Sequence, residues 1–225
     1  MKNFTKQFKP LNLPIHGVRL PSFFIEKDHK RKNGLSEDVD NFDFLRGICL
    51  NGFKKLKLKK SSKRYKEYAD RAKHELDILK ELGFIDYILL VWEVINYCKE
   101  NKIPIGLGRG SAAGSLVLYL SGITAVDPIK NGLYFERFIS KTRAKKNIVD
   151  GITYLDGNLM CDVDLDICYY NRAKVIKFLE EKFKGRTSKI LTFLINSLSI
   201  FLTKLIISPE LYFSSITKAK SLTTF

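Results

Sequence analysis

The chain has 225 residues, of which 45% are apolar, 39 are lysine or arginine and 24 are aspartate or glutamate, which gives a formal net charge of +15. This apolar content is enough for a packed core and argues against a wholly disordered chain. The positive charge favours a polyanionic partner such as nucleic acid, or an anionic membrane face. The N-terminus lacks a secretory signal, and the longest uncharged apolar stretch, residues 190–203, is shorter than the roughly 17–25 residues of a spanning helix. We therefore expect a cytoplasmic protein without a membrane partner.

The first 64 residues are expected to form a linker-like segment, with a proline-interrupted entry and one short helix around residues 44–53. The end of this segment, residues 54–64, carries seven basic residues in eleven. Such a strip is either a solvated linker or a surface that contacts nucleic-acid phosphates, and both interpretations stay open. The candidate DNA contacts are Lys54, Lys55, Lys57, Lys59 and Lys60.

The clearest periodicity lies in residues 65–185. Apolar residues at three- and four-residue steps predict an amphipathic helix from residue 65 to about Gly83. A more buried helix is predicted for residues 87–98. A third is predicted for residues 175–183, with Gly185 as the stop signal at its C-terminal end.

A glycine-rich run, GLGRGSAAGS at residues 106–115, joins an extended segment to a helix-like one. Glycines such as Gly110 let the backbone approach a ligand closely, and a following helix offers unpaired N–H groups to an anion. The guanidinium of Arg109 can donate two hydrogen bonds to one phosphate group, and the Ser111 hydroxyl can cap the helix or bind phosphate. The run therefore predicts a phosphate-binding loop.

Other loop families fit this run less well. A Walker loop needs a lysine before its Ser or Thr, and the run has none. The spacing of the Rossmann fingerprint is met, but its ribose-binding acid could only be Asp127, which precedes Pro128 and does not end a clear strand. A purely structural turn remains an alternative.

Three aspartates alternate with apolar residues in residues 162–166. In a strand, residues two apart share a face, so Asp162, Asp164 and Asp166 would point one way and their apolar neighbours the other. Like charges on one face repel unless a cation intervenes, and Mg²⁺ suits such oxygen ligands when substrate phosphates complete its shell. An EF-hand is excluded, because Ile167 stands where that loop needs glycine.

The phosphate loop and the carboxylate strand together suit phosphoryl transfer by two metal ions. A polar edge strand is the alternative for the acidic run. Residues 194–225 differ from the rest, because they are rich in Ile, Leu, Ser and Thr and show no clear period.

Residues 74–140 resemble, motif by motif, the palm of the bacterial C-family replicative polymerases, the family of the DNA polymerase III alpha subunit. The family's Gly-Arg-Gly-Ser loop matches residues 108–111, its Phe-Glu-Arg-Phe motif matches residues 135–138, and its Asp-x-Asp-x-Asp strand matches residues 162–166. The likeness is strong over residues 71–193 and faint over residues 20–64.

This resemblance implies an α+β fold, a nucleotidyltransferase-like palm with a mixed sheet backed by helices, over residues 65–193. A helical or extended basic segment, residues 1–64, would precede it. By resemblance, Asp162 and Asp164 are the catalytic residues that bind two Mg²⁺ ions, while Asp166 has a less certain role. Arg109, Gly110 and Ser111 would hold the triphosphate of an incoming deoxynucleotide. The implied partners are a DNA primer-template, deoxynucleoside triphosphates and other replicase subunits.

The sequence also departs from the family. Cys161 replaces the proline that usually precedes the first aspartate, and the connection over residues 139–161 is longer than usual and is expected to form a surface hairpin. A second basic cluster lies there, and its candidate DNA contacts are Lys141, Arg143, Lys145 and Lys146.

After residue 193 the likeness stops, so the strand with a third catalytic carboxylate is not found. We therefore expect a palm fragment of a DNA-directed DNA polymerase that is inactive by itself, with a divergent tail at residues 194–225 from a truncated or frame-shifted gene. The alternative is a non-catalytic basic module that binds nucleic acid.

Overall fold

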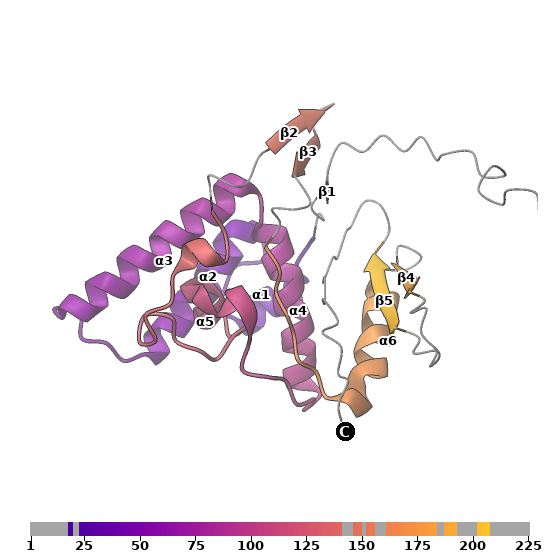
Figure 1. Ribbon diagram of the computed structural model, residues 1–225. Helices are drawn as coiled ribbons and strands as arrows, with labels where there is room; N and C mark the ends of the chain where they lie inside the picture. Colours follow the sequence, from indigo (N-terminus) through magenta and orange to yellow (C-terminus); the bar gives the residue numbers. More distant parts are fainter. Residues whose placement is uncertain are drawn as a thin grey trace, which may run out of the picture.

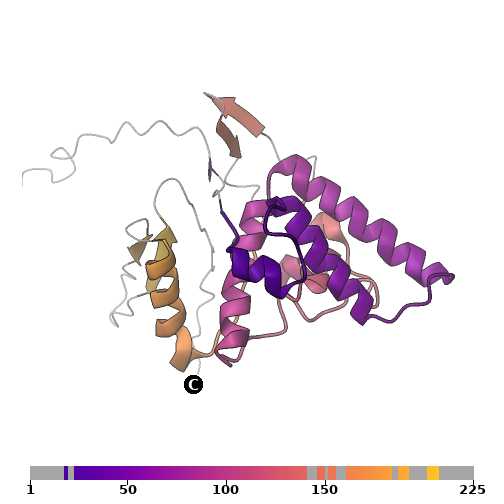
Figure 2. The same cartoon turned by 180° about the vertical axis from the view of Figure 1, so that it is seen from behind.

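A computed structural model describes residues 23–140 and 161–183 of the chain, together with the backbone of five short strands outside these ranges. In the described residues the helices are α1 (Lys27–Lys32), α2 (Asn41–Lys55), α3 (Lys63–Leu82), α4 (Ile85–Glu100), α5 (Leu116–Leu120) and α6 (Arg172–Lys182). Single 3₁₀ turns lie at Gly110–Gly114, Phe135–Arg137 and Tyr169–Asn171. Figure 1 shows α4 between the group formed by α2, α3 and α5 on one side and α6 on the other, and Figure 2 shows the same order from behind.

The helices predicted from periodicity are confirmed. The side chain of Ser62 caps α3 by accepting a hydrogen bond from the backbone N–H of Tyr65, and Gly83 ends the helix in the left-handed conformation, with φ +79°. Helix α2 is longer than the predicted segment 44–53 and is capped by Asp40. Helix α6 covers the segment predicted at its position, but Gly185 lies outside the described residues.

The main core lies where α2, α3, α4 and α5 meet. Helix α4 is buried around most of its circumference, and Ile88, Leu89 and Val91 are fully buried. Phe44 and Leu45 of α2 are also fully buried in the same cluster. Residues 41–55 thus pack with the segments that follow them, while the division of the chain at residues 64 and 193 stays a prediction.

The strands form small antiparallel sheets. Strands β1 (Val18–Arg19), β3 (Ile152–Leu155) and β2 (Lys146–Val149) pair in that order, and β4 (Thr187–Thr192) pairs with β5 (Leu202–Ile207). The pairing of β2 with β3 confirms the hairpin predicted within residues 139–161.

The predicted palm with a mixed sheet is wrong. Within residues 23–140 and 161–183 the regular elements are helices, and the strands outside them pair only in antiparallel fashion. The acidic run, read as a strand, is extended chain joined to residue 105 by the isolated bridge Ile105–Ile167. Its apolar face is buried against helices: Leu165 and Ile167 pack with Val94 and Cys98 of α4 and Val175 of α6. Alternation of apolar and polar residues indicates only that one face of the segment is buried. Helices can cover that face as well as a sheet can, so the alternation did not establish a sheet.

No helix among the described residues is both long and apolar enough to cross a bilayer.

Candidate functional site

The glycine-rich loop of residues 106–115, predicted to bind phosphate, and the acidic run of residues 162–166 lie against each other. The backbone N–H of Gly106 donates to the carbonyl of Asp166 at 2.8 Å, and the N–H of Cys168 donates to the carbonyl of Pro104 at 3.0 Å. A Cβ added to Gly106 would lie 2.9 Å from Cβ of Asp166, so a larger side chain would push the two segments apart. Two motifs that are distant in sequence are therefore held side by side by their backbones.

Arg109 lies between two of the aspartates. Its Nε is 3.4 Å from Oδ1 of Asp166 and 3.9 Å from Oδ2 of Asp164. Gly110 is equally close, since a Cβ added there would lie 3.3 Å from Oδ2 of Asp164. The side chains of Arg109 and Asp166 are more than half exposed, at 53% and 57%, so this ion-pair cluster faces solvent and is open to an incoming ligand.

Burial alternates along the acidic run, as the sequence pattern predicts. Cys161 and Val163 are buried at 3% and 5% exposure, whereas Asp162 and Asp164 are half-buried and Asp166 is exposed. Their carboxylate oxygens are the ligand type that Mg²⁺ prefers. Among the described residues no group of three or more His, Cys, Asp or Glu side chains is arranged to hold a metal ion, so further ligands would have to come from a phosphate or from elsewhere. The metal-binding roles of Asp162 and Asp164 stay predictions.

The fold itself requires glycine at several positions of the loop, whether or not a ligand binds there. Gly108 and Gly110 have φ values of +101° and +67°, which side-chain-bearing residues rarely adopt. A Cβ on Gly108 would lie 2.9 Å from Cγ2 of Thr124, and one on Gly114 would lie 2.6 Å from the carbonyl oxygen of Tyr134. The loop therefore needs glycine to pack against its own protein, which leaves both the phosphate and the structural interpretations open.

The helix after the loop does not provide a free anion site. Helix α5 has only five residues and is capped by Ser115, whose Oγ accepts from the N–H of Leu118, rather than by Ser111. The buried carboxylate of Glu75 on α3 accepts hydrogen bonds from the N–H of Val117 at 3.0 Å and from the hydroxyl of Ser115 at 2.8 Å. The N-terminus of α5 thus already has an acidic side chain of the protein's own as its hydrogen-bond partner.

Glu75 was missed by the sequence reasoning. It is fully buried, pairs with Nε of Arg71 at 2.6 Å, and has a pKa raised by burial in spite of these donors. The sequence carried a signal, because Glu75 follows Tyr68 by seven residues and so lies on the apolar face of the predicted helix. A charged residue on such a face indicates a buried polar partner.

Asp127, weighed above as a ribose-binding acid, has a structural role. It is 6% exposed, accepts the hydroxyl of Tyr68 at 2.8 Å, and accepts the N–H groups of Ile129 and Lys130 at 3.1 and 3.2 Å. These bonds form a turn after the aspartate and use both carboxylate oxygens, which argues against a dinucleotide site.

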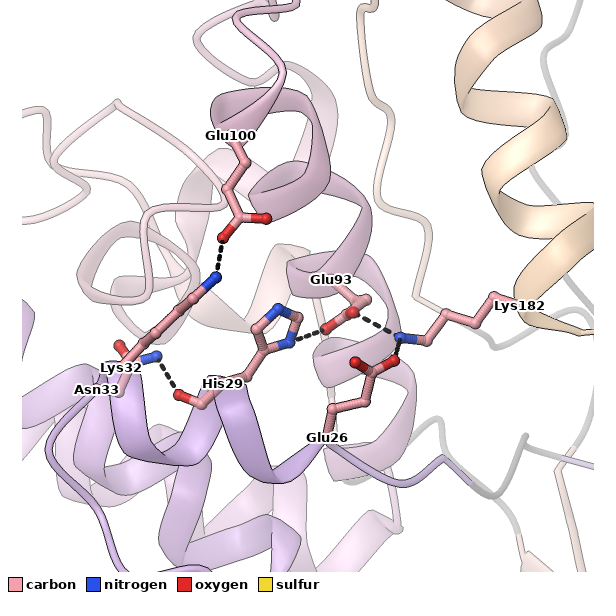
Figure 3. Close-up of polar contacts among 7 residues, drawn as sticks. All are labelled: Glu26, His29, Lys32, Asn33, Glu93, Glu100 and Lys182. Carbon is pink, nitrogen blue, oxygen red and sulfur yellow. Dashed lines mark hydrogen bonds and ion pairs between the residues drawn. The ribbon is translucent and has the colours of Figure 1, made fainter.

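A charge cluster around the buried Glu93 anchors the helix that follows the acidic run (Figure 3). Nζ of Lys182, at the end of α6, lies 2.5 Å from Oε1 of Glu93 on α4 and 3.0 Å from Oε1 of Glu26. On the other side of Glu93, its Oε2 is 3.0 Å from Nδ1 of His29 on α1, an ion-pair distance without good hydrogen-bond geometry. The cluster fixes α6 to α4 and so holds the C-terminal side of the acidic run.

An aromatic contact strengthens the same joint. The rings of Tyr97 on α4 and Phe178 on α6 are stacked, with centroids 4.0 Å apart and an interplanar angle of 11°. Beside the cluster of Figure 3, Lys32 pairs with Glu100 at 2.9 Å and so ties the end of α1 to the end of α4.

The basic candidates fall into two groups. Lys54 and Lys55 end α2, and Lys57, Lys59 and Lys60 lie in its connection to α3; all five are exposed. Lys141, Arg143 and Lys145 lie outside the described residues, and Lys146 opens β2, of which only the backbone is described. DNA contact by either group stays a prediction.

Comparison with known proteins identifies the family. Residues 43–197 match the family described as the bacterial DNA polymerase III alpha NTPase domain. The chain belongs to this family. The match begins within α2, earlier than the strong resemblance seen from residue 71, and includes both the loop and the acidic run.

Relatives named DNA polymerase III subunit alpha agree with this assignment. The chain is 39% identical to the one from Aquifex aeolicus (strain VF5) over 152 residues, which is 67% of this chain and 12% of the relative. It is 36% identical to the one from Ureaplasma parvum serovar 3 over 196 residues, 86% of this chain and 18% of the relative. For Staphylococcus aureus (strain MRSA252) the identity is 41% over 182 residues, 80% of this chain and 14% of the relative. The matched part is thus less than a fifth of each of these relatives.

Proposed function

We propose that this chain is the part of a DNA-directed DNA polymerase that binds the triphosphate of an incoming deoxynucleotide and holds metal-binding carboxylates beside it. The observation that carries the proposal is the position of Arg109 next to Asp164, in a chain of the DNA polymerase III alpha family. Phosphoryl transfer needs a cationic group that binds the phosphate close to a carboxylate that binds a metal ion. Arg109 and Asp164 are two such groups, and they lie next to each other.

Arg109 is proposed to bind the triphosphate, with Gly110 and Ser111 beside it. Its present partner, Asp166, is exposed, and an exposed ion pair contributes little free energy. A phosphate group offers the guanidinium a bidentate, charge-assisted contact, which is stronger. The guanidinium can therefore exchange an aspartate for a phosphate at small cost.

Asp162 and Asp164 are proposed as ligands for Mg²⁺. Their oxygens fit a hard cation, and oxygens of the bound triphosphate would add to the two carboxylates. When bound, the metal supplies positive charge that stabilises the transferring phosphoryl group. In the whole polymerase a primer 3′-hydroxyl would attack the α-phosphate and release pyrophosphate, with the primer-template and other replicase subunits as partners.

Nucleotide binding by this chain tests the proposal. Titration calorimetry with a deoxynucleoside triphosphate should show about 10- to 100-fold weaker binding for Arg109→Ala, since a hydrogen bond to a charged group contributes about 1.5–3 kcal/mol. Arg46→Ala is the matched control, because Arg46 is an exposed arginine on α2 with one distant partner, Asp43 at 3.9 Å. If Arg109→Ala and the unaltered chain bind the deoxynucleoside triphosphate with equal affinity, and their circular dichroism is the same, the loop has a structural role only.

One observation favours a second candidate, a non-catalytic module that binds nucleic acid. Lys57, Lys59 and Lys60 are exposed and form no ion pair with any described residue, so their charge is available to a polyanion. Such a module would bind DNA but would show no affinity for nucleotides that depends on Arg109.

A further inference from the structure

A second basic site lies apart from the phosphate loop. A cavity of about 450 Å³ opens between α2, α4 and the turn after α5. Its lining includes Lys55 from α2, Lys99 from α4, the amides of Asn51 and Asn96, and the ring of Trp92. This volume lies within the range of about 300–1,000 Å³ that is usual for small-molecule sites.

Two lysines line this cavity, and no acidic residue belongs to its lining. Among the described residues no acidic side chain lies within 4.0 Å of Nζ of Lys55 or Lys99. Glu100, which neighbours Lys99 in sequence, is paired instead with Lys32 at 2.9 Å. The ammonium of Lys99 donates to the carbonyl oxygen of Gly122 at 2.6 Å, a partner that does not cancel its charge.

The two lysines act on each other electrostatically. The pKa of Lys99 is lowered, first by desolvation of its ammonium and then by the positive charge of Lys55. Like charges that line one cavity repel, and a bound anion would reduce this repulsion and favour the charged form of both lysines. The other polar side chains of the lining are the amides of Asn33, Asn51 and Asn96 and the hydroxyls of Tyr119 and Ser121, none of which carries a negative charge.

The side chains around the lysines are held in place. Nδ2 of Asn51 donates to the carbonyl of Asn33 at 3.0 Å, and the ring of Trp92 is packed edge-on against Phe44 at 5.4 Å. A Cβ added to Gly122 would lie 2.9 Å from Nζ of Lys99, so a side chain at residue 122 would displace the ammonium. Several side chains of the lining are therefore held in place by contacts within the protein.

We propose that this cavity binds the phosphate group of a small molecule, such as pyrophosphate or a nucleotide, between Lys55 and Lys99. A concave site lined by both lysines suits a compact anion better than an extended strand of DNA. The proposal does not depend on the loop at residues 106–111, none of whose residues lines the cavity.

The single tryptophan of the chain gives a direct readout, because Trp92 lines the cavity. In one experiment pyrophosphate is titrated into the full chain at low ionic strength while the fluorescence emission of Trp92 is followed. In a second experiment a nucleoside triphosphate is titrated in the same way. We expect a saturable change that sodium chloride at matched ionic strength does not reproduce. The arm that binds more tightly identifies the source of the phosphate.

Variants decide the assignment. Lys55→Gln should weaken binding by about 10-fold, the effect of removing one charged hydrogen-bond donor, and Lys55→Glu should abolish it. Lys54→Gln removes an equal charge from the same helix but not from the lining, and should change nothing. Arg109→Ala should also leave the Trp92 signal unchanged, which separates this site from the proposed triphosphate loop.

Three results would overturn the proposal: no saturable change with either phosphate, equal affinities for Lys55→Gln and the unaltered chain, or a signal from short duplex DNA alone. Thermal melting of each variant would be measured first. If Lys55→Gln fails to fold, Asn51→Asp, which places a negative charge in the lining, serves in its place and should weaken pyrophosphate binding at least as much.

Discussion

The ammonium of Lys182 lies 2.5 Å from the carboxylate of Glu93, although the two residues are 89 positions apart. The side chains are only 13% and 3% exposed, so this pair joins α6 to α4 in a poorly hydrated place. Because α6 follows the acidic run directly, the pair also helps to fix Asp162 and Asp164 against the phosphate loop. We therefore expect this pair to stabilise the folded chain.

Lys182→Met should lower the free energy of unfolding by about 3 kcal/mol, because removing one partner leaves the carboxylate of Glu93 buried and uncompensated except by His29. Urea denaturation followed by circular dichroism measures the change. Lys177→Met on the same helix is the control, since Lys177 is 75% exposed, and it should cost less than about 0.5 kcal/mol. Equal effects of the two variants would mean that the buried pair is not stabilising.

Stability should also fall in acid. A hydrogen bond with Lys182 lowers the pKa of Glu26, and one with Lys32 lowers that of Glu100, each from an ordinary value of 4.5. A carboxyl with a lowered pKa binds fewer protons in the folded than in the unfolded chain. Its contribution is therefore complete above pH 4.5 and is lost as the pH falls through the folded pKa.

Unfolding free energies measured from pH 7 to pH 3 would test this dependence. The double variant Glu26→Gln/Glu100→Gln should show a flatter curve below pH 4.5 than the unaltered chain, because neither amide titrates. Asp70→Asn, an exposed substitution on α3, serves as the control for the loss of a surface carboxylate. A double variant as acid-sensitive as the unaltered chain would contradict the prediction.

The proposed metal ligands can be tested without catalysis. Titration of Mn²⁺ in the presence of a deoxynucleoside triphosphate should show weaker metal binding for Asp162→Asn/Asp164→Asn, since each change replaces an anionic ligand with a neutral one. Asp166→Asn should have a smaller effect, because Asp166 is the more exposed partner of Arg109. Unchanged Mn²⁺ affinity in the double variant would remove the metal assignment.

The basic strip at residues 54–64 predicts salt-dependent DNA binding. If its lysines contact phosphates, the logarithm of affinity should fall by roughly 0.9 per log unit of salt for each phosphate neutralised, with little sequence preference. Lys57→Gln/Lys59→Gln/Lys60→Gln should reduce that slope. The double variant Lys174→Gln/Lys177→Gln on α6 serves as the control for charge loss. A slope that is flat in the unaltered chain would mean that these lysines only solvate the surface.

The chain by itself is predicted not to extend a primer. Two-metal transfer needs both ions in fixed geometry, and the described residues offer no group of three acidic or metal-binding side chains. The chain also spans less than a fifth of the polymerases that it matches. A primer-extension assay with Mg²⁺ and four deoxynucleotides measures this directly. Extension that disappears in Asp164→Asn would disprove the prediction.

Several features could be predicted from the sequence because their causes are local. Ser62 and Gly83 set the ends of α3 through a cap and a left-handed residue, and the spacing of apolar residues determined which face of each helix is buried. The Gly-Arg-Gly-Ser and Asp-x-Asp-x-Asp motifs identified the family without any structure. Each of these signals lies within a few residues of the feature that it predicts.

Other features depended on contacts between distant segments, and only the tertiary structure decided them. Alternation in residues 162–166 indicated one buried face, but helices rather than a mixed sheet cover it, because an apolar face gains the same burial from either. Glu75 occupies the N-terminus of α5, where a ligand phosphate was expected. Likewise, Lys99 and Lys55 line the same cavity because α2 and α4 pack together, and the residue spacing within either helix does not predict that packing.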